Sequence, residues 1–258
     1  LKQHLPKILA QDYPAFEVIV VDDNSDDGTT EYLFFLSQKE PRLKRTKTGN
    51  SNRMMAGKKF PLTLGLKAAA NELVVLTDAD CYPATNQWLK QVVSGYATDN
   101  KAIVLGYGAY EKKPGRLNRR IRYETFLTAL NYLSFALAKL PYMGVGRNLS
   151  YQKGLFFSTN GFFDHRQIPS GDDDLFINKV ATKKNTEIVI SPDAFTYSPP
   201  KETREEWIEQ KTRHMSTARY YRAKHKFWLA LQPISHILFW VTSLYLLATV
   251  FVYWYIVA

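Results

Sequence analysis

The tripeptide Asp78-Ala79-Asp80 places two carboxylates directly after a short apolar run that ends at Thr77. Two carboxylates at the end of a buried strand are unfavourable unless they are paired or bind a cation. Magnesium typically takes one or two protein carboxylates together with the phosphates of a substrate. The tripeptide therefore either holds a divalent metal or caps a helix and forms a turn, where aspartate is also common.

Two further acidic clusters have residue types suited to chemistry. Asp22-Asp23-Asn24-Ser25 follows the β-branched run 16–21 and either caps the next helix or places a carboxylate against a base or ribose. Asp172-Asp173-Asp174 carries consecutive carboxylates, which repel one another unless a cation is near or one is protonated. This cluster is either a solvated helix start, where the helix dipole favours negative charge, or the place of a general base.

Three other features do not support a site. Gly57-Lys58-Lys59 matches half of a phosphate-binding P-loop, but the Ser or Thr that should follow the lysine is absent and Thr63 comes too late. The single cysteine, Cys81, has no obvious base beside it and is interpreted as structural; it cannot form an intrachain disulfide. The five histidines show no metal-ligand spacing on one helix face.

Strands that alternate with helices must position the acidic clusters. The hydrophobic pattern predicts strands at 16–21, 72–77, 102–107 and 187–190. It predicts helices at 1–10, 29–37, 60–70, 88–96, 117–140 and 204–226. This alternation is typical of an α/β fold with a mostly parallel sheet. Ligands of such sheets bind outside the carboxyl ends of the strands, which is where 22–25 and 78–80 lie.

Charge and hydropathy indicate an anionic partner and a membrane. The chain of 258 residues has a formal net charge of +10, which suits phosphates, nucleic acid or an acidic membrane surface. From 234 to 258 it has no Asp, Glu, Lys or Arg, and this length is enough to cross a bilayer core of about 30 Å as a helix. A buried core helix is the alternative, but the segment has no polar face. We therefore predict a domain at 1–226 and a transmembrane segment at 227–258.

Basic residues set the expected orientation of that segment. By the positive-inside rule the upstream flank is cytoplasmic, because it carries Lys211, Arg213, Arg219, Arg222, Lys224 and Lys226. A second basic group lies at 116–122, at the start of the predicted helix 117–140, whose later half is mostly apolar. That helix either lies on the membrane surface or packs on the sheet.

Taken in order, these segments resemble the family 2 inverting glycosyltransferases. The matching stretches are 11–14, 17–29, 57–58, Leu62, Gly65, 77–80, 171–175 and 210–214. The resemblance implies a Rossmann-like GT-A fold, in which a mostly parallel mixed sheet is flanked by helices, followed here by a C-terminal transmembrane helix. It also implies that a first strand of the fold would precede Leu1.

The resemblance implies a role for each matching residue on the donor side. Asp23, with Asp22 as the alternative, contacts the nucleotide base, and Lys58 lies near the nucleotide. Asp78 faces the ribose or the diphosphate, and Asp80 is the direct ligand of Mg²⁺ or Mn²⁺.

The catalytic base implied by the resemblance is Asp172 or Asp173. Alignment through Asp174-Leu175 selects Asp172, whereas alignment of the Glu-Asp motif of the family on Asp172-Asp173 selects Asp173. The sequence leaves both open.

The segment 210–214 resembles the Gln-x-x-Arg-Trp motif of membrane-embedded, often processive members of the family. Gln210 and Arg213 are thereby placed at the donor, where the planar guanidinium of Arg213 suits a diphosphate. His214 stands in place of the tryptophan that helps to form the acceptor site, which leaves processive or single transfer open.

The implied activity is that of an inverting, metal-dependent glycosyltransferase of the hexosyltransferase type. The expected partners are a nucleotide-sugar donor, with a UDP-sugar favoured, a glycan or lipid-linked acceptor, and the cytoplasmic membrane with the catalytic domain facing the cytoplasm. The alternative is a membrane-tethered basic module that binds nucleic acid or anionic lipid. No nucleic acid is expected, because the acidic clusters would repel it.

Overall fold

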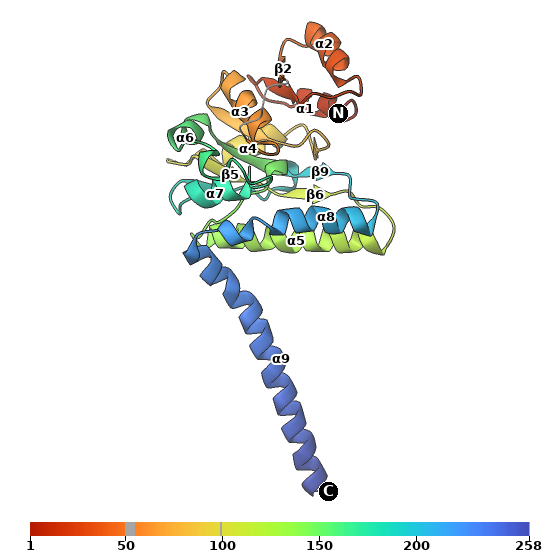
Figure 1. Ribbon diagram of the computed structural model, residues 1–258, viewed down its shortest axis with the longest axis vertical. Coiled ribbons are helices and arrows are strands. Elements are labelled where there is room, and N and C mark those ends of the chain that lie inside the picture. Colours follow the sequence, from red (N-terminus) through yellow and green to blue (C-terminus); the bar gives the residue numbers. More distant parts are fainter. Residues whose placement is uncertain (50–54, 99, 258) are drawn as a thin grey trace. The chain divides into compact units, whose positions relative to one another are not determined.

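The computed structural model describes residues 1–49, 55–98 and 100–257, with side chains placed to residue 250 in the last helix. The chain divides into two units, Leu1–Tyr220 and Tyr221–Ala258. The second unit is a single long helix, α9 (Ala223–Val257), with Pro233 inside it (Figure 1). The predicted boundary between residues 226 and 227 falls in the first turns of α9, and Ala258 lies outside the described residues.

Within the described residues of the first unit, the strands form three sheets. One pairs β1 (Val18–Asp22) in parallel with β2 (Leu43–Lys47). The second has the order β3 (Leu73–Leu76), β7 (Leu149–Gln152), β5 (Ile103–Leu105) and β8 (Thr186–Ile188). The third has the order β4 (Tyr82–Pro83), β9 (Thr196–Ser198) and β6 (Gly108–Tyr110).

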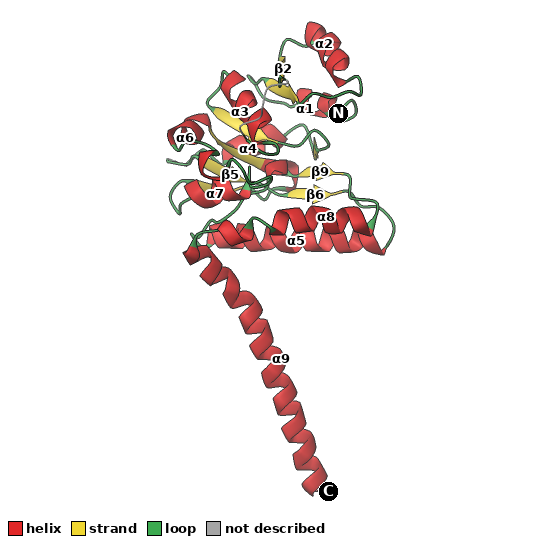
Figure 2. Cartoon of the chain, viewed as in Figure 1, coloured by secondary structure: helices red, strands yellow, loops and turns green. Residues whose placement is uncertain are grey.

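Helices cover these sheets (Figure 2). The α-helices of the first unit are α1 (Leu5–Leu9), α2 (Thr29–Lys39), α3 (Lys59–Ala68), α4 (Trp88–Ser94), α5 (Arg116–Leu137), α6 (Lys153–Ser158), α7 (Asp174–Val180) and α8 (Arg204–Met215). Short 3₁₀ turns occur at Gly146–Asn148, Phe163–His165, Pro192–Ala194 and Ala218–Tyr220. The core includes β5, whose three side chains are at most 1% exposed.

The α/β class is confirmed, with parallel and antiparallel pairs among its sheets, but these sheets contain less parallel pairing than expected. The pairs β3–β7, β5–β7 and β4–β9 are antiparallel. The antiparallel strand β7 was missed because Leu149-Ser150-Tyr151-Gln152 is only four residues long and two of the four are polar. Ser150 is accommodated because its hydroxyl donates to the carbonyl of Val74 at 2.8 Å and bonds the Tyr96 hydroxyl at 2.7 Å.

Two other predictions of secondary structure were wrong. No strand was predicted between residues 37 and 60, but the edge strand β2 lies there, and only its Leu43 is buried. The single helix predicted at 204–226 is interrupted between Met215 and Ala223. Near this break the hydroxyl of Thr217 is buried and donates to the Asp174 carboxylate, so the chain leaves the helical path to make a tertiary contact.

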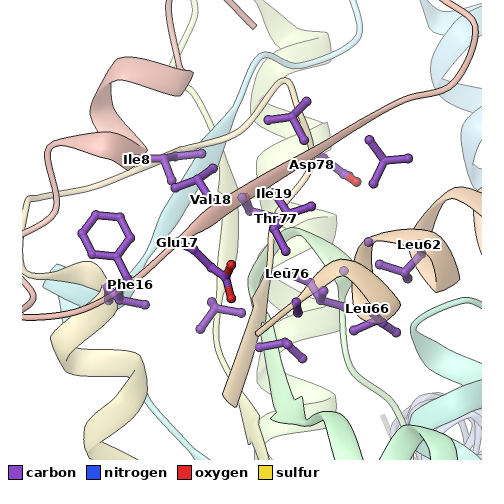
Figure 3. A pocket seen from close by; sticks show the side chains of 18 of the residues that line it. Ile8, Phe16, Glu17, Val18, Ile19, Leu62, Leu66, Leu76, Thr77 and Asp78 are labelled. Carbon is purple, nitrogen blue, oxygen red and sulfur yellow. The ribbon is translucent and has the colours of Figure 1, made fainter. Parts of the chain in front are cut away.

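Strands β1 and β3 begin close together and end at the same cleft, although they belong to different sheets. Near their starts, the Glu17 carboxylate accepts hydrogen bonds from the backbone N–H groups of Ala70 and Asn71 at 2.7 and 3.1 Å. A cavity of about 760 Å³ lies between the two strands and extends to the cleft (Figure 3). A first strand before Leu1 stays a prediction.

Helix α9 contains a candidate membrane span. The segment Ala223–Val250 is long and apolar enough to cross a bilayer, with a mean hydropathy of 1.5 in its best window. None of that window is buried, in contrast to the core helix of a soluble protein. Length and composition therefore favour the predicted transmembrane segment over a core helix.

Candidate active site

The polar end of the cavity between β1 and β3 brings together residues that are far apart in the sequence. It is lined by Asp23, Lys58, Asp78, Gly146, Asp172 and Asp173. Asp23 and Asp78 follow the ends of β1 and β3, and Asp172 and Asp173 precede α7. All three acidic clusters singled out in the sequence thus contribute to one cleft.

Lys58 and Asp78 form an ion pair inside the cleft. The Nζ of Lys58 donates to Oδ1 of Asp78 at 2.7 Å, and the lysine is the residue before the first turn of α3. Burial is the largest influence on the Lys58 pKa and lowers it, but the carboxylates of Asp78, Asp172 and Asp80 together raise the pKa above its usual value. Lys58 therefore stays a cation and can face phosphate oxygens.

The residues at the end of β3 fit a hard divalent cation. Single ligand atoms of Asp78, Asp80 and Cys81 lie within 4.8 Å of one another. Burial raises the pKa of the Cys81 thiol to about 12, and thiolate sulfur is a soft ligand, so Cys81 does not suit a hard ion. The exposed Asp80 carboxylate accepts only a weak contact from Cys81 Sγ, 3.6 Å away, within the described part of the chain. Two carboxylates remain, which suits Mg²⁺ or Mn²⁺.

Asp22 and Asp23 have different surroundings in the structure. Asp22 is buried, and its carboxylate accepts hydrogen bonds from the backbone N–H of Ser25 at 2.9 Å and from the hydroxyl of Thr30. It thereby stabilises the turn into α2. Asp23 lines the cleft and accepts a hydrogen bond from the hydroxyl of Thr48 at 2.7 Å. Asp23 is therefore the better placed of the two to meet a ligand.

Asp172 and Asp173 both face the cleft, but their surroundings differ. The two oxygens of Asp173 accept hydrogen bonds from the backbone N–H groups of Gly146 at 2.8 Å and Asp174 at 2.7 Å. Asp172 lies within electrostatic reach of Lys58 and Lys59. Burial, followed by repulsion from a neighbouring carboxylate, raises the pKa of each to about 6. A carboxylate with such a pKa is a suitable general base at neutral pH.

Comparison with sequence families decides the class of the protein. The family described as glycosyl transferase family 2 matches residues 1–163, which is more than half of the chain. The chain belongs to glycosyl transferase family 2. A search of curated proteins found no match.

Solved structures with the same fold include other glycosyltransferases. A mannosyltransferase from Pyrobaculum calidifontis, in complex with GDP-Man and Mn²⁺, is 25% identical with a TM-score of 0.61 over 80% of this chain and 55% of that one. S. aureus TarS 1-349 in complex with UDP is 20% identical with a TM-score of 0.55, over 81% and 58% of the two chains. The chain thus spans little more than half the length of these proteins. The predicted GT-A fold is confirmed.

Lys59 and Gly57 hold the loop before α7 in this family 2 chain. Neither residue was assigned a role from the sequence. Lys59 is fully buried, and its Nζ donates to the carbonyls of Ile168 and Ser170, both at 2.6 Å. Gly57 has a φ of +64°, and a Cβ there would lie 2.1 Å from the carbonyl oxygen of Pro169. The glycine and lysine that resemble half of a P-loop instead dock α3 against the loop that leads to Asp172.

Lys59→Met is expected to impair both stability and activity. It leaves two half-buried carbonyls without their donor, which lowers the free energy of unfolding by about 1–3 kcal/mol. Loosening the loop before Asp172 also misplaces the candidate base, so the transfer rate falls about tenfold or more. Thermal unfolding and initial rates measure the two effects. Lys67→Met, on the exposed side of α3, is the control, and equal behaviour of the two variants would contradict the role of Lys59.

Helix α8 carries the segment that resembles the Gln-x-x-Arg-Trp motif. The Gln210 side chain accepts a hydrogen bond from the Tyr110 hydroxyl at 3.3 Å, and Arg213 is exposed. Neither is among the residues that line the cavity. Desolvation chiefly lowers the pKa of His214, with Arg213 and Arg147 adding to this and Asp78 opposing it. His214, at the end of α8, is therefore close enough to the cleft for the Asp78 carboxylate to affect its pKa.

Proposed function

We propose that this chain transfers a sugar from a nucleoside-diphosphate-sugar donor to an acceptor hydroxyl with inversion at the anomeric carbon. One observation carries the proposal: a single cleft holds the Lys58–Asp78 pair beside Asp80 and also the raised-pKa carboxylates of Asp172 and Asp173. Membership of glycosyl transferase family 2 supports it. The alternative, a basic binding module, leaves this acidic cleft without a role.

The donor side of the cleft stabilises the leaving group. Lys58 supplies a fixed positive charge near the diphosphate, and the exposed guanidinium of Arg213, which lies outside the cavity on α8, is proposed as a second donor group. Asp80, with Asp78 beside it, would hold Mg²⁺ or Mn²⁺, and such an ion would supply positive charge opposite the leaving diphosphate. Asp23 is proposed to receive the nucleotide base, and Gln210, which lies outside the cavity on α8, is proposed to support the donor.

The acceptor side needs a base, because a sugar or lipid hydroxyl is a weak nucleophile with a high pKa. Asp172 or Asp173 takes the hydroxyl proton as the oxygen attacks the anomeric carbon from the face opposite the leaving diphosphate. One bond forms and one breaks in a single displacement, which inverts the anomeric centre. No covalent intermediate with the enzyme is required.

The transfer rate is expected to rise with pH through about 6 and to level off near neutrality. The carboxylates of Asp172 and Asp173 have pKa values raised to about 6, and only the ionised form of either accepts a proton. Below this pH the rate should fall about tenfold for each pH unit. Initial rates at saturating donor, with nucleotide binding measured at each pH as the control, test this. A flat rate profile from neutrality to about pH 5 would contradict it.

The donor, acceptor and location are part of the proposal. We favour a UDP-sugar, although the solved relatives include one with GDP-Man and one with UDP. A catalytic domain at 1–226 would face the cytoplasm, anchored in the inner membrane by the segment at 227–258. A cytoplasmic donor and a membrane anchor suit an acceptor that belongs to a lipid-linked or cell-surface glycan.

The test is the release of nucleoside diphosphate from a panel of UDP- and GDP-sugars. Each donor is incubated with the membrane-reconstituted protein and Mn²⁺ or Mg²⁺, and parallel samples contain a chelator. Release that depends on metal supports the proposal, and the anomeric configuration of the product reports inversion. Absence of both turnover and metal-dependent nucleotide binding across the panel would reject it.

A further inference from the structure

Helix α5 is apolar on two opposite faces. One face packs inside the first unit through Ile121, Ala129 and Tyr132, which are at most 4% exposed. The other face presents large apolar side chains to solvent: Tyr123, Phe126, Leu127, Leu130 and Leu137, each 41–62% exposed. We call these five residues the α5 stripe.

The spacing of the residues in the α5 stripe places them along one side of the helix. At 3.6 residues per turn its members, together with Arg116, Arg119 and Arg120, fall within an arc of about 120°, and the buried residues fall on the opposite side. A helix packed on a domain usually has charged and polar residues on its solvent face. A contiguous exposed apolar surface marks a site of interaction, because leaving it in water is unfavourable.

The charges at the end of the α5 stripe indicate what it contacts. Arg116 and Arg119 are exposed on the same face at the start of α5. Glu124, the acid of α5, is bonded to Lys211 at 3.0 Å and to Arg120 at 3.6 Å. An apolar stripe with a basic end is the pattern of helices that lie in the interface of a bilayer with anionic lipids.

The segment that connects α8 to the candidate membrane span is short, and this is compatible with contact between α5 and a bilayer. Arg120 lies over the ring of Trp207 at 5.1 Å, and together with the Glu124–Lys211 bond this pairs α5 with α8 (Figure 1). Only residues 216–222 connect α8 to the candidate membrane span, and such a segment reaches at most about 25 Å. A membrane that holds that span is therefore within reach of this helix pair.

We propose that the α5 stripe lies in the interface of the bilayer, with its apolar side chains among the lipids and Arg116 and Arg119 at anionic headgroups. The catalytic unit then has its own membrane-binding surface in addition to the candidate span. The unit that contains the cleft is then held beside the membrane in which a lipid-linked acceptor would lie. The contact itself does not depend on sugar transfer, so it can fail or succeed independently of the proposed activity.

Fluorescence quenching by lipids tests this contact in the full chain. Leu130→Cys is labelled with a thiol-reactive fluorophore, and the protein is reconstituted in vesicles with and without lipids brominated along the acyl chain. The native Cys81 is fully buried, and burial raises its thiol pKa to about 12, so the label goes to the introduced cysteine. Gln38→Cys, exposed on α2 at the opposite end of the first unit, is the matched control (Figure 1).

The expected result is a loss of fluorescence of about twofold or more at position 130 in brominated vesicles, because an interfacial helix is buried about 5–10 Å into the boundary of headgroups and acyl chains. The label at position 38 should keep its intensity. Replacing Arg116 and Arg119 by glutamine should weaken the quenching at position 130 in anionic vesicles. Equal quenching at both positions, no quenching at position 130, or formation of a disulfide-linked dimer by unlabelled Leu130→Cys would overturn the proposal.

Discussion

Asp80→Ala is expected to abolish metal-dependent donor binding and to lower the transfer rate by about 10²-fold or more. Asp80 is exposed at the end of β3, and its carboxylate is the one in the candidate metal group that is not paired with Lys58. Its loss leaves Asp78, already held at 2.7 Å by the lysine, as the only carboxylate of that group. Calorimetric titration with nucleotide, with and without Mn²⁺, measures the effect.

The matched control for Asp80→Ala is Asp193→Ala, an exposed aspartate in the turn before β9. It should keep metal-dependent binding and the rate of the unchanged protein. If Asp80→Ala still binds nucleotide more tightly with Mn²⁺ than with chelator, the assignment of the metal to Asp80 is wrong. Added metal at high concentration should not restore the rate, because a ligand has been removed rather than weakened.

Asp172→Asn and Asp173→Asn should separate the two candidates for the base. The variant that loses the base should have a transfer rate about 10²–10⁴-fold lower with donor affinity retained, because asparagine keeps the shape of the side chain but accepts no proton. The other variant should keep most of its rate. Single-turnover rates and donor dissociation constants measured on both variants distinguish chemistry from binding.

Asp174→Asn is the control for this pair, because Asp174 carries the same functional group next in sequence. Its two oxygens accept hydrogen bonds from the backbone N–H of Leu175 at 2.7 Å and from the hydroxyl of Thr217. We therefore expect this variant to lose stability rather than a catalytic group. Full activity in both Asp172→Asn and Asp173→Asn would remove the cluster from the proposed mechanism.

The sequence predicted the strands and helices whose patterns are locally strong. The β-branched run before Asp22 and the apolar run before Asp78 were identified because a buried strand needs continuous apolar residues. Helix α5 was predicted at 117–140 and is found at Arg116–Leu137. Strand β7 was missed, because its polar Ser150 is buried only through hydrogen bonds to distant residues such as Tyr96, which no local pattern reveals.

The residues of the cleft were largely named in the sequence, but their contacts were not. Nothing local distinguishes Asp22, which stabilises a turn through Ser25 and Thr30, from Asp23, which lines the cleft. Lys59 was read only as part of an incomplete P-loop, although its partners are carbonyls at Ile168 and Ser170. Such contacts join residues more than a hundred positions apart, and only the packing of α3 against the loop before α7 decides them.

By itself the sequence determined the class of the fold, the acidic clusters and the apolar C-terminal segment, because residue type and short spacing are enough to specify a strand end or a membrane-length helix. The tertiary structure alone decided which carboxylates meet, that Lys58 pairs with Asp78, and that α5 presents a second apolar face. Those facts depend on which surfaces become buried. Burial is a property of the whole packed chain and not of any short segment.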